Sequence, residues 1–459
     1  MNLPAAAPTL LLATALVSGC GSLPAADPSP SPGASVPEHW AQAPASPAVP
    51  PTDLARWWER FDDPALTALV QDALAANPSV KSAVAALRQS RALVDLARAG
   101  YSPRLNASAS AQASRMGSAA SQKQFDLGLD ASWEPDLFGA TRAGVSAAEA
   151  DARAAQMNLA DAQVSLAAEV ALAYVDLRGN QARRDIAEHN LQSQRDTLQI
   201  ASWRHQAGLV SALDVEQATA AAAQTEAQVP SLQTSVEQAW HRLAVLTGRA
   251  PGALAALEAG GVPLPPDDLA LAFPADTLRQ RPDVRAAEAH LLAAAERVTQ
   301  ANAARYPSLS LGGTLGLQAG AVDMLFDHAA LVRRLLASVA APLFDGGAID
   351  AQVRAQQAAL EQARAAHESA VLGALQEVED ALAALRGNRL SEASLRTAAA
   401  AAERADRLAR QQYESGLIDF NAVLNAQRTL LSAQDGAQTQ LAALAAGYVR
   451  LYKALGGGW

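Results

Sequence analysis

Two kinds of hydrophobic pattern alternate along this chain: short runs with a period of two residues and very long runs with a helical period. The short runs place apolar residues on one face and hydroxyl, amide or glycine residues on the other, which is typical of β-strands. Phe125 to Trp133 is the clearest run, and Leu309 to Leu317 is similar. Each run is about ten residues long, the length that a tilted strand needs to cross a bilayer. On alternation alone, a soluble hairpin with one buried face is an equal alternative.

We predict four strands in two pairs. The fourth is the poorest, because Arg333-Arg334 and Leu335-Leu336 interrupt its alternation. The predicted ranges are about 105–115, 124–133, 309–318 and 334–343.

Each strand pair is followed by a helical tract far longer than the average helix of about 11 to 12 residues. No proline occurs between Pro135 and Pro230 or after Pro342. A single glycine-centred turn divides each tract, so we predict two helical hairpins, at about 139–249 and 346–455. At about 1.5 Å per residue, one arm approaches roughly 100 Å. A cytoskeletal-type coiled coil would explain the helices but not the strands.

The second half of the chain repeats the first at a displacement of about 204 to 208 residues, far longer than solenoid periods of about 20 to 50 residues. The segment Leu177 to Asn180 returns letter for letter as Leu385 to Asn388. We therefore predict one repeat at 52–260 and a second at 261–459, each with one strand pair and one helical hairpin.

The start of the chain is predicted to be a signal peptide followed by a lipidated tether. A short apolar run ends in Val17-Ser18-Gly19-Cys20, which resembles a bacterial lipobox, so residues 1–19 are expected to be removed and Cys20 to carry lipid. Residues 20–51 are rich in Pro, Ala and Ser and are expected to form a flexible tether. The lack of Lys and Arg before the apolar run departs from the pattern, and a misassigned start codon would explain it. An unlipidated thiol is the alternative.

The composition narrows the class of function. Half of the residues are apolar but only 4% are aromatic, and an alanine-rich sequence favours closely packed long helices over a compact core. The net charge of −10 argues against a nucleic-acid partner. One cysteine excludes an internal disulfide, and the histidines form no metal or catalytic motif. We therefore expect no enzyme activity, no metal and no cofactor other than the lipid on Cys20.

Four strands per chain cannot lie alone in lipid, because the outer strands would leave backbone N–H and C=O groups unpaired. Two chains would give eight strands and a barrel filled by side chains, whereas three give twelve strands and begin to leave a lumen. The polar faces carry Asn, Ser, Gln, Asp and Gly, which suit a wet interior. A homotrimer is therefore the smallest assembly that we expect to form a water-filled, conducting pore.

Several motifs, in this order and on a duplicated chain, carry a resemblance to a known family. They are Trp57-Trp58 with Phe61 and Asp63-Pro64, Trp133 to Gly139, Arg281 to Glu288, Tyr306 to Leu309, and Pro342 to Gly347. The chain resembles the outer-membrane factors of tripartite export systems, the TolC-like channels, and within them the lipoprotein branch of the NodT or OprM type. The resemblance covers nearly everything after the tether.

The resemblance implies a mostly α-helical fold with a membrane β-barrel. Four strands from each chain of a homotrimer would form a twelve-stranded barrel, continued by a long α-helical tunnel in the periplasm. The protein would be an exit duct in the outer membrane, anchored by lipid. It would receive substrates through a periplasmic adaptor from an inner-membrane pump, expected to be of the RND type, which selects the cargo. A lipid-anchored periplasmic adaptor or a coiled-coil structural protein is the alternative.

The resemblance also assigns roles at the hairpin tips. Gly208 with Leu209, and Gly416 with Leu417, correspond to the tips that contact the adaptor, although the valine of the family's Val-Gly-Leu motif is absent from both. A purely turn-forming role for the two glycines is the alternative.

A gate at the periplasmic end is the third implication. The family's gating aspartates fall on Ala422 and Asn425, and the basic partner of its gate tyrosine falls on Ile418, so the usual arrangement is altered here. For Asp419, an ordinary solvated or N-terminal helical role is the alternative. The candidates for the gate are Asp214, Tyr413 and Asp419.

Overall fold

The computed structural model describes residues 36–41, 54–118, 120–255, 257, 260–266, 274–457 and 459. The predicted signal peptide and Cys20 lie outside these residues. The described chain forms two compact units. One contains Ala86–Gln156 and Ala286–Glu368, and the other contains the described parts of Ala34–Ala85, Met157–Arg285 and Ser369–Trp459. Each unit therefore takes segments from both halves of the sequence.

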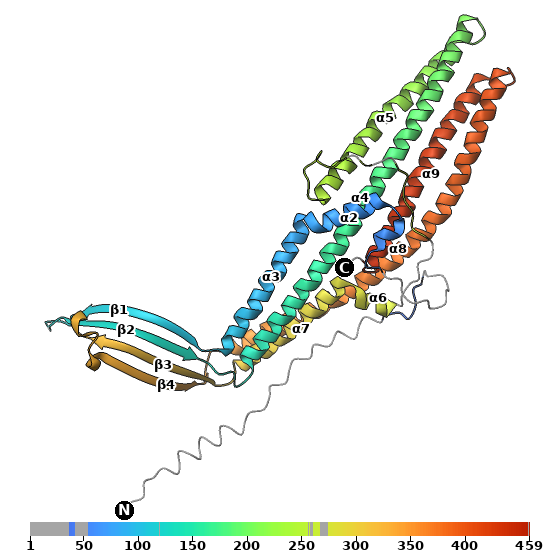
Figure 1. Cartoon of the computed structure of the whole chain (residues 1–459). Coiled ribbons are helices and arrows are strands. Elements are labelled where there is room, and N and C mark those ends of the chain that lie inside the picture. The colour runs from blue at the N-terminus through green and yellow to red at the C-terminus, as the bar shows by residue number, and fades with distance from the viewer. Residues whose placement is uncertain are drawn as a thin grey trace, which may run out of the picture. The chain divides into compact units, whose positions relative to one another are not determined.

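The helices and strands follow the duplicated order that the sequence predicts (Figure 1). The long helices have equal lengths in the two halves: 67 residues in α4 and α8, and 35 residues in α5 and α9. The α-helices are α2 Pro64–Ala76, α3 Pro78–Arg98, α4 Ala140–Gln206, α5 Ala212–Leu246, α6 Pro274–Gln280, α7 Pro282–Ala303, α8 Ala348–Glu414 and α9 Phe420–Ala454. The strands are β1 Arg104–Ser114, β2 Gln122–Trp133, β3 Ser308–Ala319 and β4 Leu331–Ala340. Short 3₁₀ helices are η1 Trp57–Phe61, η2 Ala99–Tyr101, η3 Val322–Met324 and η4 His328–Ala330.

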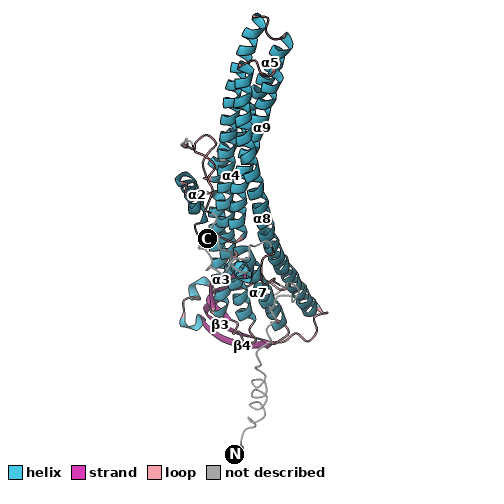
Figure 2. Ribbon diagram, turned by 90° about the vertical axis from the view of Figure 1, so that its right-hand side faces the viewer, coloured by secondary structure: helices cyan, strands magenta, loops and turns pink. Residues whose placement is uncertain are grey.

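The four strands form one antiparallel sheet in the order β1-β2-β3-β4, so β1 and β4 each have one unpaired edge (Figures 1 and 2). The sheet is amphipathic. One face pairs apolar residues, as at Leu127 opposite Leu317. On the other face, the carboxylate of Asp130 accepts hydrogen bonds from Ser108 Oγ and Thr314 Oγ1, both at 2.9 Å. This division by face is the one that a wall between lipid and water requires.

The fourth strand begins three residues earlier than predicted. β4 starts at Leu331 because this residue pairs with Leu317 of β3. Pro342 has no backbone N–H to donate, and β4 ends before it, at Ala340. The shift places both arginines that interrupt the alternation, Arg333 and Arg334, inside the strand and on opposite faces.

Two of the repeated motifs begin the two long helices. Asp136 accepts hydrogen bonds from the backbone N–H groups of Thr141 and Arg142 at the start of α4. At the start of α8, Asp345 accepts from Gly347 and Ile349 in the same manner. These backbone donors lower the pKa of Asp345. The motifs therefore satisfy N–H groups that a helix leaves unpaired in its first turn.

The core of the second unit lies around aromatic side chains. Trp57 is fully buried and stacks on Tyr452, with ring centroids 5.3 Å apart. Trp40 is 6% exposed and belongs to the same hydrophobic cluster. Beside it, the backbone N–H of Ala41 donates to Glu379 Oε1 at 2.7 Å. The segment predicted as a flexible tether therefore contains an ordered contact with α8.

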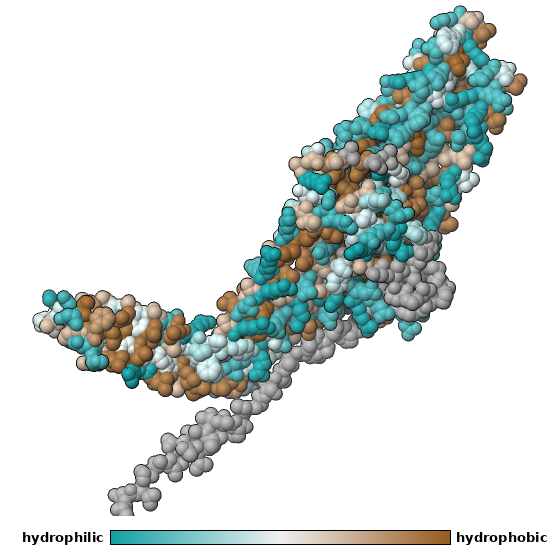
Figure 3. Space-filling model, in the orientation of Figure 1, coloured by the Kyte–Doolittle hydropathy of each residue, from teal (hydrophilic) through white to brown (hydrophobic). Residues whose placement is uncertain are grey.

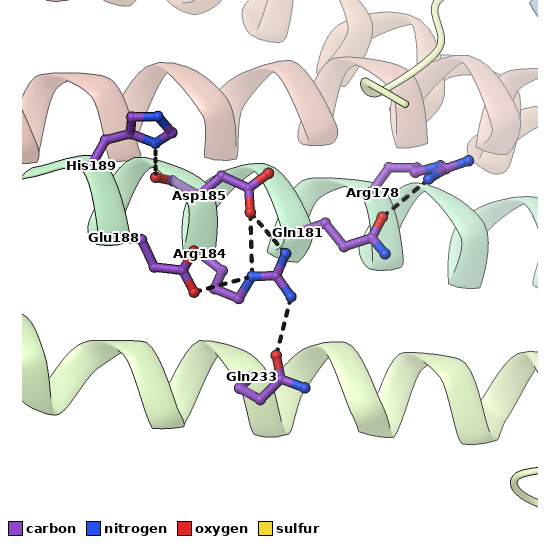
Figure 4. A network of polar contacts seen from close by, with 7 residues as sticks. All are labelled: Arg178, Gln181, Arg184, Asp185, Glu188, His189 and Gln233. Atoms are coloured by element: carbon purple, nitrogen blue, oxygen red, sulfur yellow. Dashed lines mark hydrogen bonds and ion pairs between the residues drawn. The ribbon is translucent and has the colours of Figure 1, made fainter. Parts of the chain in front are cut away.

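Within the second unit, neighbouring arginines of α4 bind two different helices. Arg183 forms an ion pair with Asp435 of α9 at 2.6 Å. Arg184 donates to Gln233 of α5 at 3.1 Å, and it also contacts carboxylates of its own helix (Figure 4). Many of the buried positions on α4 and α5 are alanine, which allows the helices to pack closely. None of the described helices is long and apolar enough to cross a membrane.

Candidate functional site at the helical tips

The two hairpins turn at glycines in the same unusual conformation. Gly208 has a φ of +73° and Gly416 a φ of +72°, a region that other residues adopt only with strain. In each turn the N–H of the following leucine closes the helix end by donating to a carbonyl five residues back, at 2.8 Å. Leu209 is 73% exposed and Leu417 is 74% exposed. The turns therefore hold two leucines in the solvent, one at each tip.

The predicted gate aspartates both cap helices. Asp214 lies in the first turn of α5 and accepts hydrogen bonds from Ser211 N at 3.0 Å and Ser211 Oγ at 2.8 Å, which completes a capping box. Asp419 precedes α9 and accepts from Ala422 N at 2.9 Å. Asp419 therefore has the helix-capping role that was the alternative to a gate role in the sequence analysis. Asp214 has the same kind of role.

The structure brings most of the predicted tip and gate residues together. A cleft of about 470 Å³ separates the two tips. Of the predicted site residues, Leu417 does not line this cleft, and Cys20 lies outside the described residues. The predicted residues that line the cleft are Gly208, Leu209, Asp214, Tyr413, Gly416 and Asp419.

Arg204 is a tip residue that the sequence reasoning missed. Its guanidinium lies over the Tyr413 ring, 4.3 Å from the ring centroid. It also donates to the backbone carbonyls of Tyr413 at 3.2 Å and Glu414 at 3.4 Å, in the last turn of α8. A cation at this position stabilises the helix C-terminus as well as the ring contact. A basic side chain from the other hairpin therefore contacts Tyr413, although position 418 is isoleucine.

Tyr413 connects this contact to the small hydrophobic core at the tips. Its side chain is 7% exposed and packs against Phe420, with ring centroids 5.4 Å apart. Its hydroxyl has no hydrogen-bond partner among the residues that the structure describes. Within the described chain, no group of three His, Cys, Asp or Glu side chains is placed to hold a metal ion.

An amphipathic sheet with two open edges, in the same chain as two helical hairpins with apolar tips, is typical of a protomer of an oligomeric membrane channel. The family model described as "Outer membrane efflux protein" matches residues 69–249 and 273–457. The chain belongs to this family, and the two matched segments correspond to the two halves of the duplicated sequence.

Relatives of known name agree with this assignment. The chain is 32% identical to the pyoverdine export outer membrane protein OpmQ of Pseudomonas aeruginosa, over 98% of this chain and 96% of that protein. It is also 32% identical to the toluene efflux pump outer membrane protein TtgF of Pseudomonas putida, over 88% of this chain and 85% of that protein. The solved structure of the outer-membrane channel OprN has a TM-score of 0.86 and 36% identity, covering 94% of this chain and 99% of that chain.

These findings confirm the predicted fold class, function and location. The protein is an outer-membrane exit channel of a tripartite efflux system, a trimer with a β-barrel and a periplasmic helical tunnel, which works with a periplasmic adaptor and an inner-membrane pump. The family and the named relatives are channel proteins rather than enzymes.

Proposed function

We propose that this channel accepts cargo from an RND-type pump through an adaptor that docks on the tip leucines, Leu209 and Leu417. The observation that carries the docking proposal is the matched geometry of the tips: the same glycine conformation and nearly the same leucine exposure in both halves. An aliphatic side chain held on a rigid turn suits a pocket on a partner protein. The RND assignment follows from the resemblance to the NodT and OprM branch.

The pump rather than the channel is proposed to select the cargo. OpmQ and TtgF are equally identical to this chain, yet one is named for pyoverdine export and the other for toluene efflux. Two relatives that are equally identical to this chain but are named for different cargo support a selecting role for the partner. The genes that adjoin this one identify the pump class, and a neighbouring proton-driven pump gene is the expected result.

Replacing both tip leucines with serine should weaken adaptor binding at least about tenfold, since each substitution removes a central apolar anchor. Binding of the purified full-length trimer to the adaptor would be measured by surface plasmon resonance. Leu390→Ser is the matched control, because Leu390 is equally exposed on α8 but lies away from the turns. Equal affinities for the wild type, the double variant and the control would remove the docking assignment.

The cleft between the tips is proposed to be part of the gate. The contact between Arg204 and Tyr413 joins the last turns of α4 and α8, so it must break before the two hairpin tips can separate. Asp214 and Asp419 place carboxylates in the same cleft while they cap α5 and α9. In a threefold mouth these carboxylates would attract cations.

Cys20 is proposed to carry the lipid anchor, on the basis of the lipobox. Cys20→Ser should abolish labelling by radioactive palmitate and reduce retention in the membrane fraction, because no other cysteine is present in the chain. Labelling would be followed by fluorography of the immunoprecipitated protein. Undiminished label in the variant would contradict the assignment.

A further inference from the structure

The apolar face of the sheet carries two cations that its alternation does not explain. Residues that pair directly across the ladder share a face, and Lys123 pairs with Ala113 while Arg333 pairs with Leu315. Both cations therefore lie on the face that also presents Leu335, which is 90% exposed. Figure 3 shows hydrophobic residues over the strands of this sheet. Because the sheet is part of the channel's membrane barrel, this face contacts lipid.

Carboxylates are absent from the same face. Over the four strands, the residues of this face are Leu, Ala, Val, Phe, Trp and Gly apart from the two cations, and the strand aspartates, Asp126 and Asp130, lie on the opposite face. No ion pair joins Lys123 or Arg333 to a carboxylate within the described part of the chain. A cation that faces hydrocarbon without a counter-ion is unfavourable, so the anion has to come from outside the protein.

Each cation lies near the loop end of its own strand, and the register places Arg333 in the row of Leu129, six residues along β2 from Lys123. Lys123 is the second residue of β2, and Arg333 is the third residue of β4, about 7 Å from the start of that strand at roughly 3.3 Å per residue. Long cationic side chains reach toward the polar boundary from such positions. This end carries the strand-connecting loops, whereas the opposite end leads into the helices. Since the helical tunnel is periplasmic, the loop end faces the outer leaflet.

The opposite end of the sheet has aromatic residues but no cation on the apolar face. Trp133 donates its indole N–H to the carbonyl of Tyr101 at 3.0 Å, and Phe138 stacks on Tyr306 with ring centroids 5.0 Å apart. Aromatic side chains suit the ordinary interface of a phospholipid leaflet. The loop end also carries Phe125 and the exposed Phe326, so aromatic residues lie toward both ends, whereas both cations lie toward the loop ends of their strands. This matches a membrane whose outer leaflet is the richer in exposed phosphate.

We infer that Lys123 and Arg333 bind the phosphate groups of the glycolipid, lipid A, in the outer leaflet. Lipid A combines several acyl chains with phosphorylated sugars, so the molecules around the barrel can cover the leucines while their phosphates neutralise each cation. The surface is an interaction site for a lipid headgroup on the outside of the barrel, distinct from the route that cargo takes through the lumen.

The test uses the purified full-length trimer in detergent, with native mass spectrometry to measure bound bisphosphorylated lipid A. Lys123→Gln combined with Arg333→Gln should weaken binding at least about tenfold, in proportion to two lost charge-assisted contacts. Arg334→Gln is the matched control, because it removes the adjacent arginine from the opposite face. Equal binding by the double variant and the wild type, or an equal loss in the control, would overturn the inference.

A second experiment keeps the wild-type protein and varies the lipid. Wild-type trimer should bind dephosphorylated lipid A and phosphatidylglycerol at least about tenfold more weakly than bisphosphorylated lipid A, because only the latter combines clustered phosphate with several acyl chains. Asp323 lies in η3 and Asp327 immediately before η4, both in the loop before β4. If one of them neutralised Arg333 instead, wild-type binding would not depend on lipid phosphate, and the inference would fail even if the double variant did not assemble.

Discussion

Arg281→Met is expected to destabilise the folded protomer by about 3 kcal/mol, because it removes one partner of a buried ion-pair group. The Arg281 side chain is 7% exposed and binds Asp283, Glu377 and the carbonyl of Ala454 at 2.6 to 2.8 Å. It thereby holds the start of α7 to α8 and to the end of α9. We choose the low end of the usual range of about 3 to 5 kcal/mol because Glu377 is 58% exposed and stays partly hydrated in the variant.

The loss would be measured as a lower urea midpoint of the purified trimer, followed by tryptophan fluorescence. Arg279→Met is the control, since Arg279 is 80% exposed and, among the residues that the structure describes, pairs only with Asp276 of its own helix. An exposed pair of this kind contributes less than about 1 kcal/mol. Similar midpoints for the two variants would show that the group around Arg281 does not hold these helices together.

The ion pair between Arg281 and Asp283 also predicts that the stability of the protein depends on pH. Burial acts to raise the pKa of Asp283, but the hydrogen bonds and charge of Arg281 outweigh it and hold that pKa below its ordinary value. The stabilisation from this carboxylate is therefore present above the ordinary aspartate pKa and is lost as pH falls through the lowered one. Without Arg281 the burial of Asp283 is opposed only by backbone hydrogen bonds, so the difference in stability between wild type and Arg281→Met should narrow below about pH 4.

Arg204→Gln is expected to raise the open fraction of the channel about 5- to 30-fold, which corresponds to about 1 to 2 kcal/mol. The glutamine cannot form the cation–π contact with Tyr413 or place a charge at the end of α8. Loss of the cation–π contact together with the charge at the helix end is expected to cost about 1 to 2 kcal/mol. The tips should then separate more readily while the rest of each hairpin stays folded.

Conductance in planar bilayers measures this change without an adaptor. Arg195→Gln is the matched control, because Arg195 lies on the same helix but its ion pair with Glu226, at 2.9 Å, joins α4 to α5 within one hairpin. We expect more frequent and larger openings in Arg204→Gln and wild-type behaviour in Arg195→Gln. If neither variant differs from the wild type, the contact between Arg204 and Tyr413 is structural and not part of the gate.

The sequence predicted the strands and hairpins well because their signals are local. Period-two alternation, the lack of proline and the glycine turns each act within a few residues, so β1 to β4 and the two hairpins could be located without contacts. The start of β4 was misplaced because Arg333-Arg334 breaks the alternation. Hydrogen-bond pairing with β3 overrides that local signal. This pairing depends on a second strand, so it cannot be read from the sequence of β4 alone.

Arg204 could not be assigned from the sequence because its partner is 209 residues away on another hairpin. Its position in the last turn of α4 predicts only a favourable contact with its own helix dipole. Repetition of letters is also an incomplete guide. Arg178 is buried and donates to the Tyr174 hydroxyl at 3.0 Å, whereas its counterpart Arg386 is exposed. The duplicated halves thus share a backbone plan but not every side-chain environment.

The open edges of β1 and β4 have a thermodynamic consequence. Strand pairing within one chain leaves a row of backbone donors and acceptors that only another copy can satisfy, so folding of the sheet and association are one equilibrium. By mass action, the unfolding midpoint of this protein depends on its total concentration. Comparisons between variants are therefore meaningful only at matched protomer concentration, and dilution alone acts as a denaturant.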